Sequence, residues 1–108
     1  MAIYKSYANG GPVTPWGRAD SCEDYGEGVK FYSTPSHGGF RISGAALRRI
    51  PQQFRMMYSA KGWFEEDCDW AIPVYFLPEY FSAAEYVSAV DTLSCWHPNV
   101  LKHNAATA

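Results

Sequence analysis

The chain has 108 residues, which fits one domain and leaves no room for a second hydrophobic core. Its formal charge of −2 at pH 7 gives no overall basic field, which makes nucleic acid an unfavourable partner. No stretch is long and apolar enough for a transmembrane helix, and the first residues lack the apolar run of a signal peptide. We therefore expect a soluble, cytoplasmic protein that does not associate with a membrane.

The charges are unevenly distributed along the chain. Residues 1–60 carry seven Lys or Arg and four Asp or Glu, a net of +3, whereas residues 61–91 carry one Lys and seven Asp or Glu, a net of −6. The two parts either attract each other within the fold or present an acidic face to a basic partner. Aromatic residues make up 17% of the chain, and such rings serve either as core or as contact surface.

The three cysteines, Cys22, Cys68 and Cys95, are odd in number and widely spaced. A zinc site or a disulfide framework normally shows paired, closely spaced cysteines, which this chain lacks. The pattern favours reduced thiols in a reducing compartment, with no metal and no cofactor.

The first half of the chain predicts a small antiparallel sheet. Residues 1–13 are rich in glycine, proline and small polar residues, and we expect an irregular arm there. A strand over 20–25, a glycine turn over 25–28 and a strand over 29–34 predict a hairpin, and 40–42 predicts a third strand.

The second half predicts helices. Ser43 is a candidate N-cap for a helix over 44–50, and a further helical segment follows Pro51 over 52–58. A helix is also expected to begin near Glu65, although Pro73 conflicts with its interior. The Ser82-x-x-Glu85 capping box predicts a helix that reaches about residue 95.

Together these elements predict an α+β fold, with a hairpin and a third strand packed against two or three helices. We expect a single domain over 14–101 and a flexible tail over 102–108.

The segment 33–40, Ser-Thr-Pro-Ser-His-Gly-Gly-Phe, is the first candidate site. Glycines after His37 leave backbone N–H groups free to hold an anion, and His37 itself is a potential base or metal ligand. The alternative is a hairpin loop in which the glycines adopt positive φ and His37 hydrogen-bonds within its own loop.

The segment 62–70, Gly-Trp-Phe-Glu-Glu-Asp-Cys-Asp-Trp, is the second candidate site. On a helix, Glu65 and Asp69 would share one face, and the carboxylates could bind a divalent cation or act as general acid or base. The alternative is a solvated first turn that complements the helix dipole. Asp67 would lie nearer the apolar face, where it needs a partner such as His37 or Arg41.

A Cys68–His37 nucleophilic dyad is a weaker option. Cys68 falls within the predicted apolar stripe, and a buried cysteine is usually inert.

The motifs Thr-Pro-Trp-Gly over 14–17, Ser-Thr-Pro-Ser-His-Gly-Gly-Phe over 33–40 and Gly-Trp-Phe-Glu-Glu-Asp-Cys-Asp-Trp-Ala over 62–71 occur in this order. In this respect the chain resembles a small domain of unknown function found in bacterial plasmids, integrative elements and phages. The chain departs from the family pattern at Phe64, where tyrosine is usual, and at Pro73. The resemblance implies a mobile-element protein, and such proteins often block host defence systems.

Three hypotheses follow. In the first, the protein is a non-catalytic domain that binds a host or defence-complex protein as an anti-CRISPR or anti-restriction inhibitor, with homodimerisation left open. In the second, it is a small metal-dependent or acid–base enzyme that uses His37 with Glu65, Glu66 and Asp67. In the third, which is compatible with the first, Trp16, His37, Asp67 and Trp70 form a buried polar network. The residues expected to form the binding surface are Trp16, His37, Arg41, Trp63, Glu65, Glu66, Asp69 and Trp70.

Overall fold

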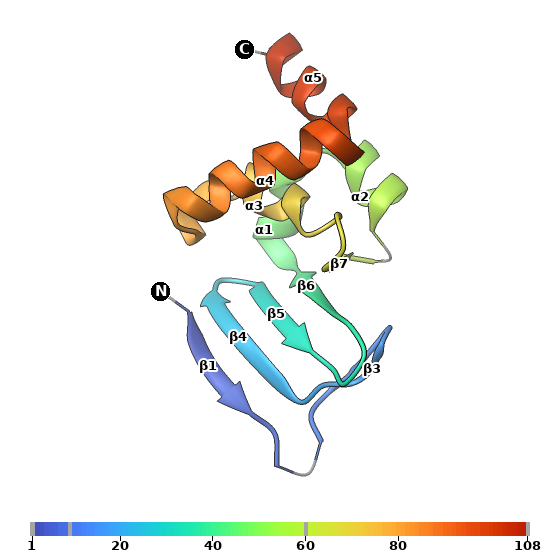
Figure 1. Cartoon of the computed structure of the whole chain (residues 1–108), viewed down its shortest axis with the longest axis vertical. Coiled ribbons are helices and arrows are strands. Elements are labelled where there is room, and N and C mark those ends of the chain that lie inside the picture. The colour runs from blue at the N-terminus through green and yellow to red at the C-terminus, as the bar shows by residue number, and fades with distance from the viewer. Residues whose placement is uncertain (1, 9, 60, 108) are drawn as a thin grey trace.

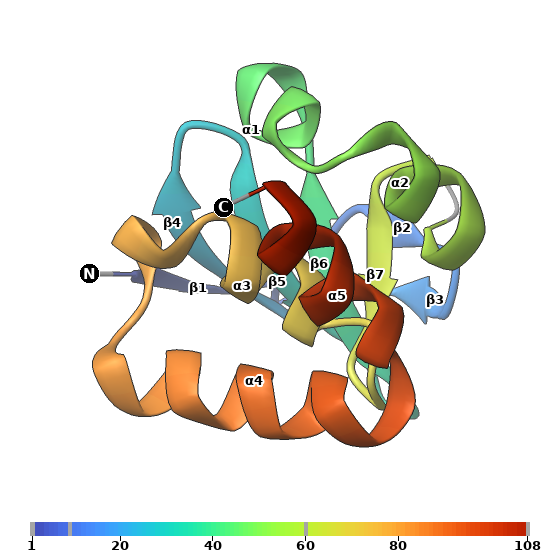
Figure 2. The ribbon, with the colours of Figure 1, turned by 90° about the horizontal axis from the view of Figure 1, so that it is seen from above.

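The computed structural model describes residues 2–8, 10–59 and 61–107. Strands lie at one end of its long axis and helices gather at the other, as Figure 1 shows. Figure 2 views the same fold from above, with α4 and α5 in front of the sheet. This arrangement confirms the predicted α+β fold. No helix in these described ranges is both long and apolar enough to cross a lipid bilayer.

The main sheet has five antiparallel strands in the order β1-β4-β5-β6-β7. A separate two-stranded sheet pairs β2 with β3. The strand bounds are β1 Ile3–Ser6, β2 Val13–Thr14, β3 Gly17–Arg18, β4 Ser21–Gly26, β5 Val29–Ser33, β6 Gly38–Ile42 and β7 Trp63–Glu65.

The β4–β5 hairpin follows from its turn chemistry. Gly26 and Gly28 adopt φ values of 95° and 88°, which cost little without a Cβ atom. Gly28 is doubly constrained, because a Cβ there would lie 2.5 Å from the carbonyl oxygen of Ser43. The predicted hairpin and the predicted third strand are therefore both present.

The expectation of an irregular arm over residues 1–13 is wrong for Ile3–Ser6 and for Val13, whereas residues 1 and 9 lie outside the described ranges. Ile3–Ser6 form the edge strand β1, which pairs with β4, and Val13 begins β2. The backbone of Tyr7 also donates to the carbonyl of Asp20 over 2.9 Å. Pairing with the edge of β4 orders this segment, and such a non-local contact leaves little trace in local composition.

Five α-helices and one short 3₁₀ helix complete the fold in the described ranges. They are α1 Gly44–Arg49, α2 Gln52–Tyr58, α3 Ala71–Phe76, η1 Pro78–Tyr80, α4 Ala83–Trp96 and α5 Pro98–Thr107. The capping box of α4 is formed as predicted: Glu85 N–H donates to Ser82 Oγ over 3.1 Å and Ser82 N–H donates to Glu85 Oε1 over 2.9 Å. Residues 102–107 of the expected tail belong to α5, and residue 108 lies outside the described ranges.

The predicted helix start at Glu65 is also wrong. Glu65 ends strand β7, residues 66–70 form turns, and helix α3 begins only at Ala71. Pro73 is thus the third residue of α3, where a backbone N–H has no intrahelical acceptor. The ring is accommodated in this first turn without a kink, and the apparent conflict disappears.

The hydrophobic core lies between the sheet and the helices. Buried side chains come from β5–β7 and from all five α-helices, among them Ile42, Phe54, Phe64, Leu93 and Val100. A second, smaller cluster holds Ala19, Cys22 and Tyr32, with Tyr7 and Trp63 packed against it. Trp63 and Phe64 therefore point to different clusters, as neighbouring strand residues do.

Candidate functional site

The Thr-Pro-Trp-Gly motif forms the tight β2–β3 hairpin. The buried Thr14 hydroxyl donates to the carbonyl of Gly17 over 2.7 Å and accepts from the N–H of Trp16 over 3.1 Å. These two bonds close the turn from inside and fix the backbone on both sides of Pro15. The hairpin thereby holds the Trp16 indole in one place against the main sheet.

The two glycines after His37 are required by close packing. Gly38 and Gly39 belong to strand β6 and have no positive φ. A Cβ on Gly39 would lie 2.4 Å from both Phe64 O and Trp16 Cη2. The predicted anion-binding nest is therefore wrong, because both glycines pair with β5 and Gly39 also pairs with β7.

The loop interpretation of this segment is right for His37 itself. Its N–H donates to Thr34 Oγ1 over 3.0 Å, and its carbonyl accepts from the Thr34 hydroxyl over 2.7 Å and from the Thr34 N–H over 2.8 Å.

Aromatic rings gather where the β2–β3 hairpin meets β7. The rings of Trp16 and Trp63 are perpendicular, with centroids 5.7 Å apart, and Tyr32 lies 5.6 Å from Trp63. The Arg41 guanidinium lies over the Trp63 ring at 5.3 Å and donates to the carbonyl of Lys61. Contacts on several sides fix the Trp63 indole.

An open pocket of about 330 Å³ lies beside these two indoles. We call it the indole pocket, and its lining residues are Pro15, Trp16, Met57, Ser59, Trp63, Glu65 and Asp69. Four of the residues expected to form a binding surface thus lie around one pocket: Trp16, Trp63, Glu65 and Asp69. They come from the β2–β3 hairpin, from β7 and from the turns before α3.

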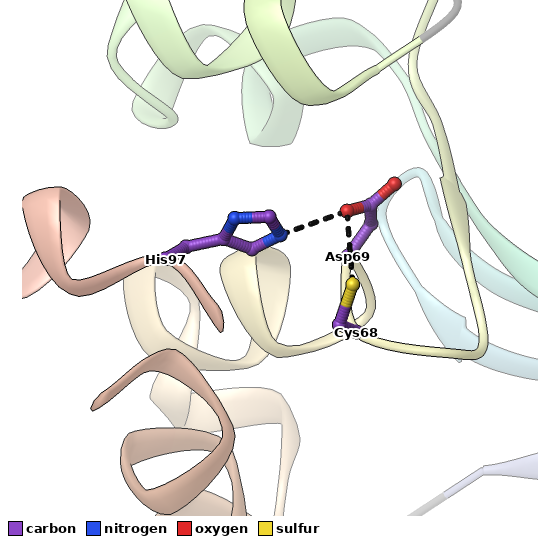
Figure 3. A group of neighbouring side chains, drawn as sticks. All are labelled: Cys68, Asp69 and His97. Carbon is purple, nitrogen blue, oxygen red and sulfur yellow. Dashed lines mark hydrogen bonds and ion pairs between the residues drawn. The ribbon is translucent and has the colours of Figure 1, made fainter. Parts of the chain in front are cut away.

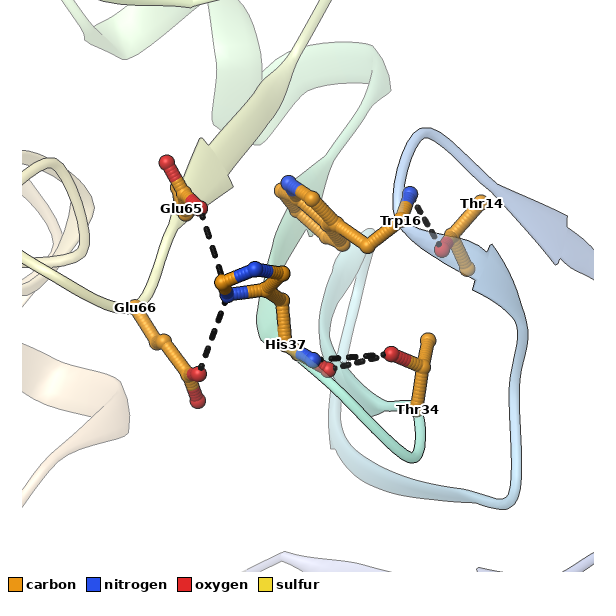
Figure 4. A network of polar contacts seen from close by, with 6 residues as sticks. All are labelled: Thr14, Trp16, Thr34, His37, Glu65 and Glu66. Atoms are coloured by element: carbon orange, nitrogen blue, oxygen red, sulfur yellow. Dashed lines mark hydrogen bonds and ion pairs between the residues drawn. The ribbon is translucent and has the colours of Figure 1, made fainter.

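His37 adjoins the acidic rim of this region. Its Nδ1 atom lies 3.7 Å from Glu65 Oε2 and 4.0 Å from Glu66 Oε2, as Figure 4 shows. The His37 side chain is 50% exposed, so the three groups form a solvated surface cluster. When protonated, His37 would offset part of the negative charge there.

The expected buried network of Trp16, His37, Asp67 and Trp70 is not formed. His37 and Asp67 are exposed, and the carboxylates beside His37 are those of Glu65 and Glu66. The error follows from the wrong helix assignment, which placed Asp67 near an apolar face. Trp70 and Glu66 instead line a second pocket with Glu23, Tyr25, Phe31, Phe40, Val74 and Glu85.

A third arrangement joins two adjacent residues to a distant histidine. His97 Nε2 lies 3.0 Å from Asp69 Oδ1, and the Cys68 thiol donates to the same oxygen over 3.7 Å, as Figure 3 shows. The ligand atoms of all three residues lie within 4.8 Å of one another. The histidine near Cys68 is thus His97, in place of the His37 considered for a dyad.

This cluster is not arranged for nucleophilic catalysis. Burial raises the pKa of the Cys68 thiol, and the neighbouring Asp69 carboxylate raises it further. A catalytic cysteine needs the opposite shift, with the imidazole next to the sulfur. Here the carboxylate accepts a hydrogen bond from the thiol and pairs with the imidazole.

Sequence reasoning missed His97 and Met57. His97 is the C-cap of α4 and comes directly before Pro98, and 28 positions separate it from Asp69. Neither spacing nor periodicity relates two residues so far apart. Met57 lies near the end of α2 and is 63% exposed, a property that the sequence alone does not reveal.

The fold and this surface define a small α+β domain with an aromatic, acidic pocket between a hairpin and a sheet edge. A family model described as a domain of unknown function, DUF7007, matches residues 10–108, and the chain belongs to this family. Comparison with curated proteins and with solved structures gives no match.

Proposed function

We propose that the protein is a non-catalytic protein-binding domain whose indole pocket receives a lysine or arginine side chain of its partner. The observation that carries the proposal is the convergence of two indoles and two carboxylates, those of Trp16, Trp63, Glu65 and Asp69, on one open pocket.

Each part of this lining suits a basic side chain. Indole is the best aromatic partner for a cation, and a cation over its face gains about 0.5–2 kcal/mol, more as water is excluded. A carboxylate accepts charge-assisted hydrogen bonds from an ammonium or guanidinium group. Met57 adds a flexible, polarisable wall that adapts to an aliphatic stem. Among the described residues that line the pocket there is no lysine or arginine, and Asp69 is paired with His97 through one of its two oxygens.

Two other pockets also combine acidic and aromatic side chains. The second pocket carries Glu23, Glu66 and Glu85 beside aromatic rings, and a third carries Glu23, Glu85 and Glu79, of which Glu79 is already paired with Arg49. Within the part of the chain that the structure describes, neither lining contains a lysine or arginine. A partner with several basic side chains could therefore be bound at more than one point, and electrostatic attraction would speed its association.

The resemblance to mobile-element domains suggests which partner to seek. Proteins of plasmids and phages often act on host defence complexes, and many such complexes bind nucleic acid through basic surfaces. We therefore propose a basic surface of a host defence complex, of CRISPR or restriction type, as the target. The choice of a defence complex rests on the resemblance to a class of proteins, whereas the basic chemistry of the target follows from the lining of the pocket.

A paired affinity capture tests the proposal. Wild-type protein, Glu65→Gln and the control Asp91→Asn are each used as bait in a host lysate at low salt. Asp91 is an exposed carboxylate on α4 outside all three pockets, so the two variants remove one charge each. We expect a partner that is captured by the wild type and the control, and weakened with Glu65→Gln.

Salt provides a second readout from the same experiment. Raising the ionic strength from about 0.1 M to about 1 M shortens the Debye length from about 10 Å to about 3 Å. Capture should fall accordingly. Equal capture by the wild type and Glu65→Gln at every salt concentration would exclude a basic group in this pocket.

A further inference from the structure

The Cys68, Asp69 and His97 cluster brings three kinds of ligand atom together from two parts of the fold. Cys68 and Asp69 lie in the turns between β7 and α3, and His97 lies at the junction of α4 and α5. Figure 3 shows the thiol and the imidazole approaching one carboxylate oxygen. The His97 side chain is 11% exposed and that of Asp69 is 25% exposed, so the cluster is largely sheltered from water.

The three donors match the ligands of a borderline-soft divalent cation. Zn²⁺ binds cysteine sulfur at about 2.3 Å, and histidine nitrogen and carboxylate oxygen at about 2.0–2.2 Å, in a tetrahedral arrangement. Those bond lengths place neighbouring donors about 3.3–3.8 Å apart. The observed separations are 3.0 Å and 3.7 Å, and the largest is within 4.8 Å, so side-chain adjustment alone would bring them into range.

We propose that Cys68, Asp69 and His97 form a three-ligand site for a thiophilic divalent cation, with Zn²⁺ as the expected ion. Binding releases the Cys68 thiol proton to solvent, and the sulfur and the carboxylate then balance the two positive charges of the ion. The site shares Asp69 with the indole pocket, but the proposed partner recognition does not require a bound metal.

The position of the site gives the cation a structural role. It would link the turns that follow β7 to the start of α5, two segments that are far apart in the sequence. Three protein ligands leave a fourth position for water or for a donor from another molecule. Asp69 also lines the indole pocket, so the site lies next to that surface.

Co²⁺ binding tests the proposal directly, because Co²⁺ replaces Zn²⁺ and is visible spectroscopically. The full chain is reduced, freed of metal with a chelator and titrated with Co²⁺. We expect about one equivalent to bind, with a near-ultraviolet band from thiolate-to-cobalt charge transfer and visible bands typical of tetrahedral coordination. Zn²⁺ should then displace the Co²⁺ and abolish both signals.

Two ligand variants and two matched controls locate the site. Cys68→Ala should abolish the charge-transfer band. His97→Gln should weaken metal binding at least about 100-fold, since the loss of even a residue that only hydrogen-bonds to a ligand lowers metal affinity about 10–100-fold. The control Cys95→Ala removes an exposed thiol on α4, and His37→Ala removes the exposed histidine beside Glu65. Both controls should bind Co²⁺ as the wild type does.

Circular dichroism of each variant before titration shows whether it is folded. If Cys68→Ala does not fold, His97→Gln and the wild-type charge-transfer band still decide the question. Absence of stoichiometric Co²⁺ binding to the wild type would overturn the proposal. Loss of binding in Cys95→Ala or His37→Ala, with Cys68→Ala unaffected, would place the metal elsewhere and overturn it as well.

Discussion

The Trp16 indole stands perpendicular to that of Trp63, with ring centroids 5.7 Å apart. One ring is carried by a hairpin of two short strands and the other by an edge strand of the main sheet. The contact therefore joins the two sheets and at the same time builds one wall of the indole pocket. Stability and the proposed binding function depend here on the same pair of side chains.

The packing of Trp16 against Gly39 leads to the first prediction. Gly39→Ala places a methyl group 2.4 Å from Trp16 Cη2 and from the carbonyl oxygen of Phe64. The backbone atom belongs to the paired strand β7, so the hairpin or the sheet must shift. We expect a loss of about 1–3 kcal/mol in the free energy of unfolding, measured by urea denaturation. Ser36→Ala, in the exposed loop before β6, serves as the control and should change little.

Asp67 gives a prediction that separates this structure from the buried network expected from the sequence. Because Asp67 is exposed, Asp67→Ala should change the free energy of unfolding by no more than about 0.5 kcal/mol. A buried, paired carboxylate would instead cost several times more. Thermal and urea unfolding of this one variant decide between the two arrangements, and a large loss would contradict the exposed position.

The capping box of α4 gives a third prediction. Ser82→Ala removes the oxygen that accepts from Glu85 N–H and should cost about 1 kcal/mol. Ser88→Ala is the matched control, since Ser88 is exposed within the same helix and alanine has the higher helix propensity. We expect the control to be neutral or slightly stabilising, and equal losses in the two variants would show that the cap contributes nothing.

A fourth prediction concerns alkaline pH. Burial and then the nearby carboxylates of Glu23 and Glu85 raise the pKa of Tyr25 from 10.0 to about 12. As the pH rises, the Tyr25 hydroxyl therefore loses its proton in the unfolded chain first. The contribution of Tyr25 to the free energy of unfolding is complete below pH 10 and is lost as the pH rises through about 12.

The variant Tyr25→Phe isolates this effect from the other titrating groups. The free energy of unfolding of both proteins is measured at about pH 9 and about pH 11.5. The wild type should lose more stability across this interval than Tyr25→Phe does. Identical losses would mean that Tyr25 titrates normally in the folded protein.

Local signals in the sequence were sufficient for part of the fold. The Gly26 and Gly28 turn, the break at Pro51 and the Ser82–Glu85 box each act over a few residues, and the predicted hairpin and helices follow them. The strands β1 and β7 were missed because each is ordered by an edge of the sheet that is distant in the sequence. The run of carboxylates from Glu65 onwards is typical of the first turn of a helix. A short strand followed by turns accommodates the same residues.

The candidate site could likewise be predicted only in part. Trp16 and Trp63 were both expected to form part of the binding surface, and the structure brings their rings together. The structure places His37 beside Glu65 and Glu66, which the second hypothesis grouped with it, whereas the buried pairing of His37 with Asp67 is wrong, since the register of residues 65–70 determines which carboxylate faces it. The contact between Asp69 and His97 depends on how α4 and α5 return to the sheet, and no local pattern encodes it.

Site-specific photo-crosslinking tests the central claim, that partners bind at the indole pocket. A photoreactive amino acid replaces Met57, which lines the pocket and is 63% exposed, or Val87, which lies on α4 and is 66% exposed. Both variants are irradiated in host lysate under identical conditions. The account predicts a specific crosslinked protein from position 57 and none from position 87. The same crosslinked protein from both positions at equal yield, or one from position 87 alone, would contradict it.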